Sequence, residues 1–344
     1  MTARKSEISL LNILMCLAVV FVHILSWTIG NVDKSSVQYI FVLVPWRLLQ
    51  FVVQGFIFLS AVKLFSSKKE ANYESFLAGR YKRVVLPYVI WVLVYYVYFI
   101  KYFGYTFSFD KLGEYLFFGT ICSHFYFVVI IMQFYLNMPL FKWLTKKVNL
   151  IALCVGSVIF TALFKQYVHF QYDDRVFPAY LCYFAIGAAV GLHYEKAKEF
   201  IKRRFYLAAV PFVLFAFFDA LCTYRAQVFG DTFKYIEIVH LFYCIFATLF
   251  FFGLFVLLSN GKKIPKFLAL LDRSSYSIYL SHVLFIYIAN DLAARLNIVG
   301  ITENLVFRAV FTYVLTLGLC MAVAAITEKI KNGKQTSRTV SKSA

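Results

Sequence analysis

Long apolar runs separated by short polar connections constrain the fold of this chain more than any other feature. Most runs are close to, or longer than, the ~20 residues that a helix needs to cross ~30 Å of hydrocarbon. They are much longer than the strands of a membrane barrel and do not alternate apolar with polar residues. The sequence therefore predicts an all-α polytopic membrane protein. The predicted spans lie at about 8–29, 38–63, 84–100, 116–141, 149–164, 177–194, 205–223, 235–258, 274–290 and 304–327.

The composition agrees with this class. Hydrophobic residues make up 62% of the chain and charged residues 15%, whereas a soluble domain is typically about half apolar and about a quarter charged. The seven cysteines lie in or beside apolar runs without any C-x-x-C pair. This pattern is typical of small hydrophobic side chains and does not favour a metal site or a disulfide framework.

The basic residues are distributed unevenly along the chain. Most of the 35 lysines and arginines fall before the first span, in every second connection and after the last span. Because cytoplasmic segments carry this excess, we predict about ten spans with both termini in the cytoplasm. The net charge of +18 then reflects topology and contact with anionic lipid, so no nucleic-acid partner is expected. Residues 1–330 are predicted to form one transmembrane domain, and 331–344 a polar, disordered tail.

Several ionisable side chains lie within or just inside the predicted spans. Such groups usually face the interior of a bundle or a wet cavity, so each is a functional candidate. His23 lies roughly 22 Å into the first span at 1.5 Å per residue, and Arg47 and His124 enter from the opposite side. We predict that these three side chains meet near the bilayer centre. A helix–helix hydrogen bond remains the alternative for each histidine. The other candidates are His282 near the midplane, and Asp219, Glu237, His240 and Arg308.

A second candidate site precedes the third span. Arg80 and Arg83 are three residues apart, so they share one face if a helix has begun there. Two guanidiniums at a helix N-terminus suit phosphate oxygens. The alternative is that they only contribute to the cytoplasmic excess of positive charge.

Five segments, in order along the chain, resemble the membrane-bound acyltransferase family 3, whose members acylate surface polysaccharides and other exported glycans. The first is similar to the family's first helix, which ends in a signature histidine, and the third to its R-x-x-R motif. The segments are "LLNILMCLAVVFVH", "GFIFLSA", "GRYKRVVLPYVIW", "SHFYFVVIIMQFYLNMPLF" and "SSYSIYLSHVLFIY".

The resemblance implies roles for individual residues. His23 matches the catalytic histidine, and Arg80 and Arg83 match an arginine pair that contacts the acyl donor. Three positions match lesser family positions around the acceptor or the oxyanion: His124, Tyr126 (where tryptophan is usual) and His282. Arg47 joins this group on its predicted depth alone.

One position departs from the family pattern. An arginine is usual eleven residues before the histidine, at the cytoplasmic end of the first helix, and this chain has Asn12 there. Either Lys5, Arg80 and Arg83 compensate for the missing charge, or the donor is handled differently, or the chain is not a working acyltransferase.

The resemblance implies an O-acyltransferase of the bacterial plasma membrane. It would move an acyl group, most simply acetyl, from cytoplasmic acyl-CoA to a hydroxyl of an extracytoplasmic glycan, with no tightly bound cofactor. His23 would act as a general base or carry the acyl group itself. The alternative is a non-enzymatic exporter or flippase of a polysaccharide or lipid-linked sugar, although no inverted repeat of the transporter kind is visible. The oligomeric state stays open.

Overall fold

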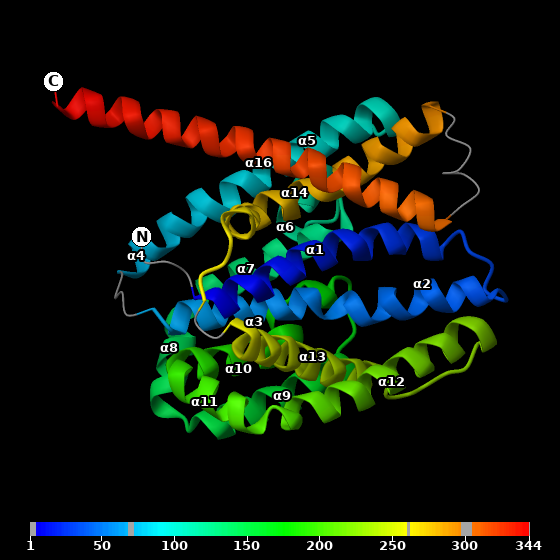
Figure 1. The fold of residues 1–344 in the computed structure, drawn as a ribbon, viewed down its shortest axis with the longest axis vertical. Coiled ribbons are helices and arrows are strands. Elements are labelled where there is room, and N and C mark those ends of the chain that lie inside the picture. The colour runs from blue at the N-terminus through cyan, green and yellow to red at the C-terminus, as the bar shows by residue number, and fades with distance from the viewer. Residues whose placement is uncertain (1–4, 68–71, 260–261, 297–304, 344) are drawn as a thin grey trace.

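The structure is a computed structural model that describes residues 5–67, 72–259, 262–296 and 305–343, with the backbone alone at residue 305 and beyond residue 327. Every regular element in these ranges is helical (Figure 1). The α-helices are α1 (Ser6–Ile29), α2 (Val37–Leu48), α3 (Val52–Phe65), α4 (Tyr73–Arg80), α5 (Leu86–Phe103), α6 (Phe109–Phe118), α7 (Tyr126–Leu136), α8 (Met138–Lys147), α9 (Leu150–Tyr167), α10 (Leu181–Leu192), α11 (Tyr194–Arg204), α12 (Tyr206–Phe229), α13 (Ile236–Ser259), α14 (Lys266–Arg295) and α16 (Leu305–Ser343).

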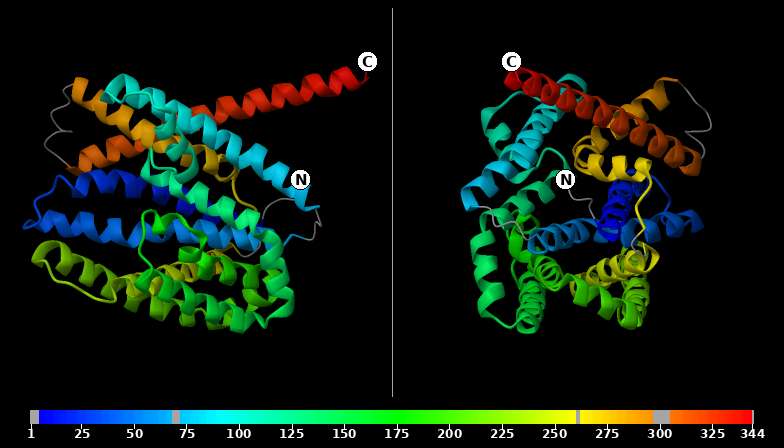
Figure 2. Two further views of the ribbon diagram at one scale, coloured as in Figure 1. Left: turned by 180° about the vertical axis from the view of Figure 1, so that it is seen from behind. Right: turned by 60° about the vertical axis from the view of Figure 1, so that its left-hand side comes forward.

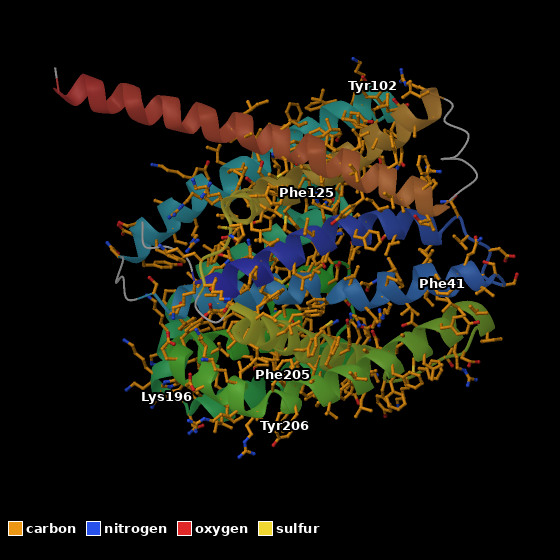
Figure 3. The ribbon with its side chains drawn as sticks, in the orientation of Figure 1. Phe41, Tyr102, Phe125, Lys196, Phe205 and Tyr206 are labelled. Atoms are coloured by element: carbon orange, nitrogen blue, oxygen red, sulfur yellow. The ribbon has the colours of Figure 1, made fainter. Side chains whose placement is uncertain are left out.

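The helices confirm the predicted class and number of spans. Among the described residues, 8 helices are long and apolar enough to cross a membrane, or up to 10 if each of two bent pairs counts as one span. The bent pairs are Phe109–Phe118 with Ser123–Leu136, at 53°, and Phe177–Leu192 with Tyr194–Arg204, at 103°. Both described ends of the chain lie at the end of the bundle that carries α4 and α11 (Figures 1 and 2). Lys196 on α11 marks this end, and Phe41 and Tyr102 mark the opposite one (Figure 3).

The last helix is longer than the predicted span. The backbone of α16 continues to Ser343, through most of the segment 331–344 for which the sequence predicts disorder. Once a helix has formed, each residue that is added loses its own conformational freedom but gains one hydrogen bond. An apolar span can therefore carry a polar helical extension.

Helix α1 lies in the middle of the bundle. It contacts α2, α3, α13, α14 and α16. In Figures 1 and 2, α5, α14 and α16 lie on one side of α1, and α9, α12 and α13 lie on the other. A histidine on α1 is therefore in reach of groups from both halves of the bundle.

Short non-α segments interrupt the spans next to predicted site residues. The 3-10 turn η1 (Leu49–Phe51) follows Arg47, and the π-helical segment η2 (Tyr81–Val85) contains Arg83. The 3-10 turn η3 (Ser123–Phe125) contains His124. Irregular backbone at membrane depth is tolerated where protein surrounds it, and π-helical segments are frequent at functional sites.

Helices α3 and α10 pack through a glycine. A Cβ atom at Gly187 would lie 2.5 Å from the carbonyl oxygen of Phe58 and 2.9 Å from the Cβ of Ala61. Small residues allow this close approach between helices in a membrane. The alanine at position 61 is accommodated because its neighbour on α10 has no side chain.

We therefore expect Gly187→Ala to destabilise the protein by about 1–3 kcal/mol, because backbone atoms cannot move away from the new methyl group. The measurement is the apparent melting temperature in detergent. Gly156→Ala on α9 is the matched control, since a Cβ there meets nothing within 4 Å. Equal melting temperatures for the two variants would contradict this account of the α3–α10 contact.

Candidate active site

Three histidines from distant parts of the sequence meet inside the bundle. The ring centroid of His23 on α1 lies 5.8 Å from that of His124 on η3 and 5.0 Å from that of His282 on α14. The centroids of His124 and His282 are 4.8 Å apart. We call these three residues the histidine cluster. The sequence predicts that His23, His124 and Arg47 meet. In the structure His23 and His124 do meet, and the third member of the group is His282 instead of Arg47.

The backbone around η3 places His124 in the cluster. Helix α6 ends at Gly119, whose φ of +66° suits a glycine. A Cβ there would lie 2.9 Å from the carbonyl carbon of Phe125, so the chain folds back tightly against the turn. The hydroxyl of Tyr279 on α14 donates to the carbonyl oxygen of His124. The break in this span is thus held by a turn glycine and by a neighbouring helix.

A tyrosine from α5 supports the third histidine. The hydroxyl of Tyr95 donates to the carbonyl oxygen of Leu280, at 3.2 Å, and accepts from the backbone N–H of Leu284, at 2.7 Å. These two residues flank His282 on α14. The Tyr95 ring also contacts the His124 ring, with centroids 5.7 Å apart. Tyr95 therefore ties together the helices that carry two of the three histidines.

The ring nitrogens of the cluster differ in their partners. Nδ1 of His282 lies 2.7 Å from the carbonyl oxygen of Tyr279 and 3.2 Å from that of Ile278. Because a carbonyl oxygen only accepts, Nδ1 carries the proton of a neutral ring and Nε2 keeps its lone pair. Nε2 of His282 and both ring nitrogens of His124 are buried without a hydrogen-bond partner among the described residues. Buried polar atoms rarely stay unpaired, so the cluster is prepared to bind a polar group.

His23 borders a cavity of about 200 Å³, which we call the His23 cavity. His23 is half-buried, whereas His124 and His282 are almost fully enclosed. His23 and His124 both line this space, and His23 is the more exposed of the two. The polar and aromatic residues lining the cavity are His23, Ser26, Trp46, Gln50, Gln54, Ser123, His124, Tyr126, His240 and Tyr279.

Arg47 forms a separate ion pair behind this cavity. Its Nε and Nη2 lie 2.9 and 2.8 Å from the two carboxylate oxygens of Asp219, whose side chain is fully buried. Nδ1 of His240 lies 2.9 Å from Oδ2 of the same carboxylate. The predicted meeting of Arg47 with His23 and His124 is wrong, because depth along a span does not determine which way a side chain points. The guanidinium of Arg47 neutralises the carboxylate of Asp219, and a buried carboxylate needs such a partner of opposite charge.

A second cavity, of about 260 Å³, contains the predicted donor-binding residue Arg80. The guanidinium carbon of Arg80 lies 5.0 Å from the ring centroid of Phe76 and 4.8 Å from that of Tyr135. Its Nε is buried without a hydrogen-bond partner in the described part of the chain. We call this space the Arg80 cavity. Its charged and polar lining residues are Asn12, Ser60, Lys63, Arg80, Asp272, Arg273 and Ser275.

Arg83 does not share the Arg80 cavity. Its side chain is exposed, and its Nε donates to the carbonyl oxygen of Gly79 at 3.0 Å. The sequence places both arginines at a helix N-terminus. This prediction is wrong, because the continuous helix already begins at Tyr73. Arg80 is the last residue of α4 and Arg83 lies in η2, where π-helical winding changes the angle between residues three apart.

Asn12 lines the Arg80 cavity. Its Nδ2 donates to Oδ1 of Asp272 at 2.7 Å and to the hydroxyl of Ser275 at 2.9 Å. The ammonium of Lys63 on α3 donates to Oδ1 of Asn12 at 3.4 Å. The cation beside Asn12 is thus Lys63. Lys5, one of the residues expected to compensate, is instead paired with Glu195 at 2.7 Å.

A family profile described as an acyltransferase domain matches residues 6–325 of the chain. The chain belongs to this acyltransferase family. A Bacillus subtilis (strain 168) protein named "Putative membrane-bound acyltransferase YfiQ" is 23% identical over 300 residues, covering 82% of this chain and 81% of that protein. No solved structure matches the chain significantly. The prediction of an acyltransferase enzyme is confirmed, and the exporter alternative is set aside.

Several residues of the two cavities were not identified from the sequence. Lys63 was detectable as a charge near the end of an apolar run, and Tyr279 lies inside the segment "SSYSIYLSH" that carries the resemblance. Gln50 and Gln54 carry no charge, and glutamines in a span give no comparable signal. In the described ranges, no group of three or more His, Cys, Asp or Glu side chains is arranged to hold a metal ion.

The buried ion pair leads to a stability prediction. We expect Asp219→Ala to destabilise the acyltransferase by about 3–5 kcal/mol, because it leaves the guanidinium of Arg47 without its partner. The double variant Arg47→Met/Asp219→Leu should recover most of this loss, since it removes both charges together. The measurement is the apparent melting temperature in detergent. A double variant less stable than Asp219→Ala would show that the pair is needed for more than charge neutralisation.

Proposed function

We propose that the protein is an O-acyltransferase that moves an acyl group from cytoplasmic acyl-CoA to a hydroxyl of an extracytoplasmic glycan. The observation that supports this most directly is a pair of cavities, one lined by Arg80 and the other by His23 and His124, that share Tyr279 in their linings. One contains Lys63 and Arg80, which belong to the last turns of α3 and α4, and Asn12 of α1. The other contains His23 and neutral polar side chains.

The Arg80 cavity has the chemistry expected for an acyl-CoA. Arg80 and Lys63 suit its phosphate oxygens. Arg83 stays at the surface, where it can attract the anionic nucleotide by its charge. This proposal places the chain ends in the cytoplasm of a bacterial plasma membrane, where acyl-CoA is available.

The His23 cavity has the chemistry expected for a sugar. The amides of Gln50 and Gln54 and the hydroxyls of Ser26 and Ser123 can hydrogen-bond to sugar hydroxyls, and Trp46 and Tyr126 offer aromatic faces. Neutral donors and acceptors of this kind suit an uncharged glycan better than an anion.

The reaction then balances as follows. His23 takes the proton of the acceptor hydroxyl, the oxygen attacks the thioester carbonyl, and the C–S bond breaks. The products are the O-acyl ester and the CoA thiol, whose sulfur receives the proton. In the covalent variant, His23 first takes the acyl group on a ring nitrogen and then passes it to the hydroxyl. His124 and His282 pack against the His23 ring and position it for either route.

We expect His23→Ala to reduce acceptor-dependent release of CoA from acetyl-CoA by a factor of about 100 or more, since a positioned base contributes 10²–10⁴-fold. The assay uses purified protein in lipid nanodiscs with a soluble oligosaccharide acceptor. His169→Ala is the matched control, because His169 is exposed and lines neither the Arg80 cavity nor the His23 cavity. Full activity in His23→Ala would remove His23 from the mechanism, and no CoA release by the wild type with any acceptor would refute the proposed function.

Arg80 and Arg83 should differ in their effect on the donor. We expect Arg80→Ala to raise the KM for acyl-CoA about ten-fold or more, because a charge-assisted hydrogen bond contributes about 1.5–3 kcal/mol. Arg83→Ala should raise it far less, since its side chain lies outside the cavity. Steady-state kinetics at varied acyl-CoA concentration distinguish the two. Equal effects of both substitutions would contradict the assignment of the Arg80 cavity to the donor.

A further inference from the structure

One side chain is common to the linings of the two cavities. Tyr279 is the residue that lines both the Arg80 cavity and the His23 cavity; their other lining residues differ. Two phenylalanines on the Arg80 side pack against it. The ring centroid of Tyr279 lies 5.3 Å from that of Phe127 and 6.1 Å from that of Phe56, which are themselves 5.8 Å apart. We call Phe56, Phe127 and Tyr279 the aromatic partition.

The Tyr279 ring is also in contact with the histidine cluster. Its centroid lies 5.5 Å from that of His124 and 5.9 Å from that of His282. Its hydroxyl donates to the carbonyl oxygen of His124, and its side chain is buried. A ring held by a hydrogen bond at its hydroxyl and surrounded by packed aromatic groups has one preferred position.

We propose that Tyr279 closes the route between the two cavities and limits the length of the acyl chain that the enzyme transfers. This inference rests on the proposed function, which places the donor in the Arg80 cavity and the acceptor in the His23 cavity. The thioester carbonyl can reach His23 only past the aromatic partition. Whatever part of the acyl chain passes it shares about 200 Å³ with the acceptor sugar. A two-carbon acyl group leaves room for that sugar, whereas each further methylene competes with it.

The same ring keeps the two sides of the membrane apart. An open passage between cavities with polar linings would let water and ions through the middle of the bundle. A ring that moves only when an acyl group displaces it would prevent this leak and would also exclude water from the thioester. The position of the Tyr279 ring would therefore both limit the length of the acyl chain and prevent leakage of water and ions between the two cavities.

The partition can be tested without enzymatic activity. Ser26 lines the His23 cavity, so Ser26→Cys is a reporter there, read against the background of the native cysteines. The probe is the impermeant anion methanethiosulfonate ethylsulfonate, added to oriented vesicles on the side of the Arg80 cavity. We expect Tyr279→Ala to raise the labelling rate at least about ten-fold, because it opens a void in the shared wall.

Two further variants keep this test decisive. Tyr279→Leu retains an apolar side chain without the ring, and its labelling rate should fall between those of the parent and the alanine variant. Tyr287→Ala is the matched control, because Tyr287 lies on the same helix and lines neither the Arg80 cavity nor the His23 cavity. Equal labelling rates in the parent and in the alanine and leucine variants at position 279 would overturn the partition.

Length selection is measured as the ratio of kcat/KM for acetyl-CoA to that for hexanoyl-CoA. We expect this ratio to fall at least about ten-fold in Tyr279→Ala and Tyr279→Leu, since single methylenes are discriminated 10–200-fold in tight pockets, and to stay unchanged in Tyr287→Ala. An unchanged ratio in both position-279 variants, in a protein that transfers acetyl groups, would refute length selection alone. If the wild type uses no acyl-CoA, length selection fails together with the proposed function, and the labelling still decides whether Tyr279 separates the cavities.

Discussion

The absence of water from the bilayer core determines most of this structure. Every backbone N–H and C=O group at membrane depth needs a partner within the protein, so the spans are helices and breaks occur only where other helices surround them. The break at η3 meets this condition through Gly119 and through the hydroxyl of Tyr279. One member of the candidate active site, His124, lies at this break, whereas His23 and His282 lie on the regular helices α1 and α14.

Two groups of buried polar side chains behave differently under the same constraint. Asp219 is fully paired with Arg47 and His240, so this group can stabilise the bundle without binding anything else. Nε2 of His282 and both ring nitrogens of His124 have no such partners within the described ranges. This contrast, more than depth in the membrane, distinguishes a structural charge from a group prepared for chemistry.

The sequence predicts well whatever depends on distance along a helix, and poorly whatever depends on rotation about it. The spans and the depths of His23 and His124 follow from counting residues at 1.5 Å each. The direction of Arg47 does not follow from its depth in α2. The separation of Arg80 from Arg83 falls at the junction of α4 and η2, which leaves no clear signal in the sequence. Tyr279 carries no charge, so its position between the two cavities emerges only when helices α3, α7 and α14 are placed together.

The break at η3 also imposes an order on biosynthesis. The segment from α6 to α7 leaves the ribosome long before α14, which supplies the hydroxyl that satisfies the carbonyl oxygen of His124. Until α14 has been made, this bent segment enters the membrane with polar backbone groups that lack their final partners. The insertion machinery must therefore shelter it while about half of the spans are still to come, and the histidine cluster is completed only after α14 has been made.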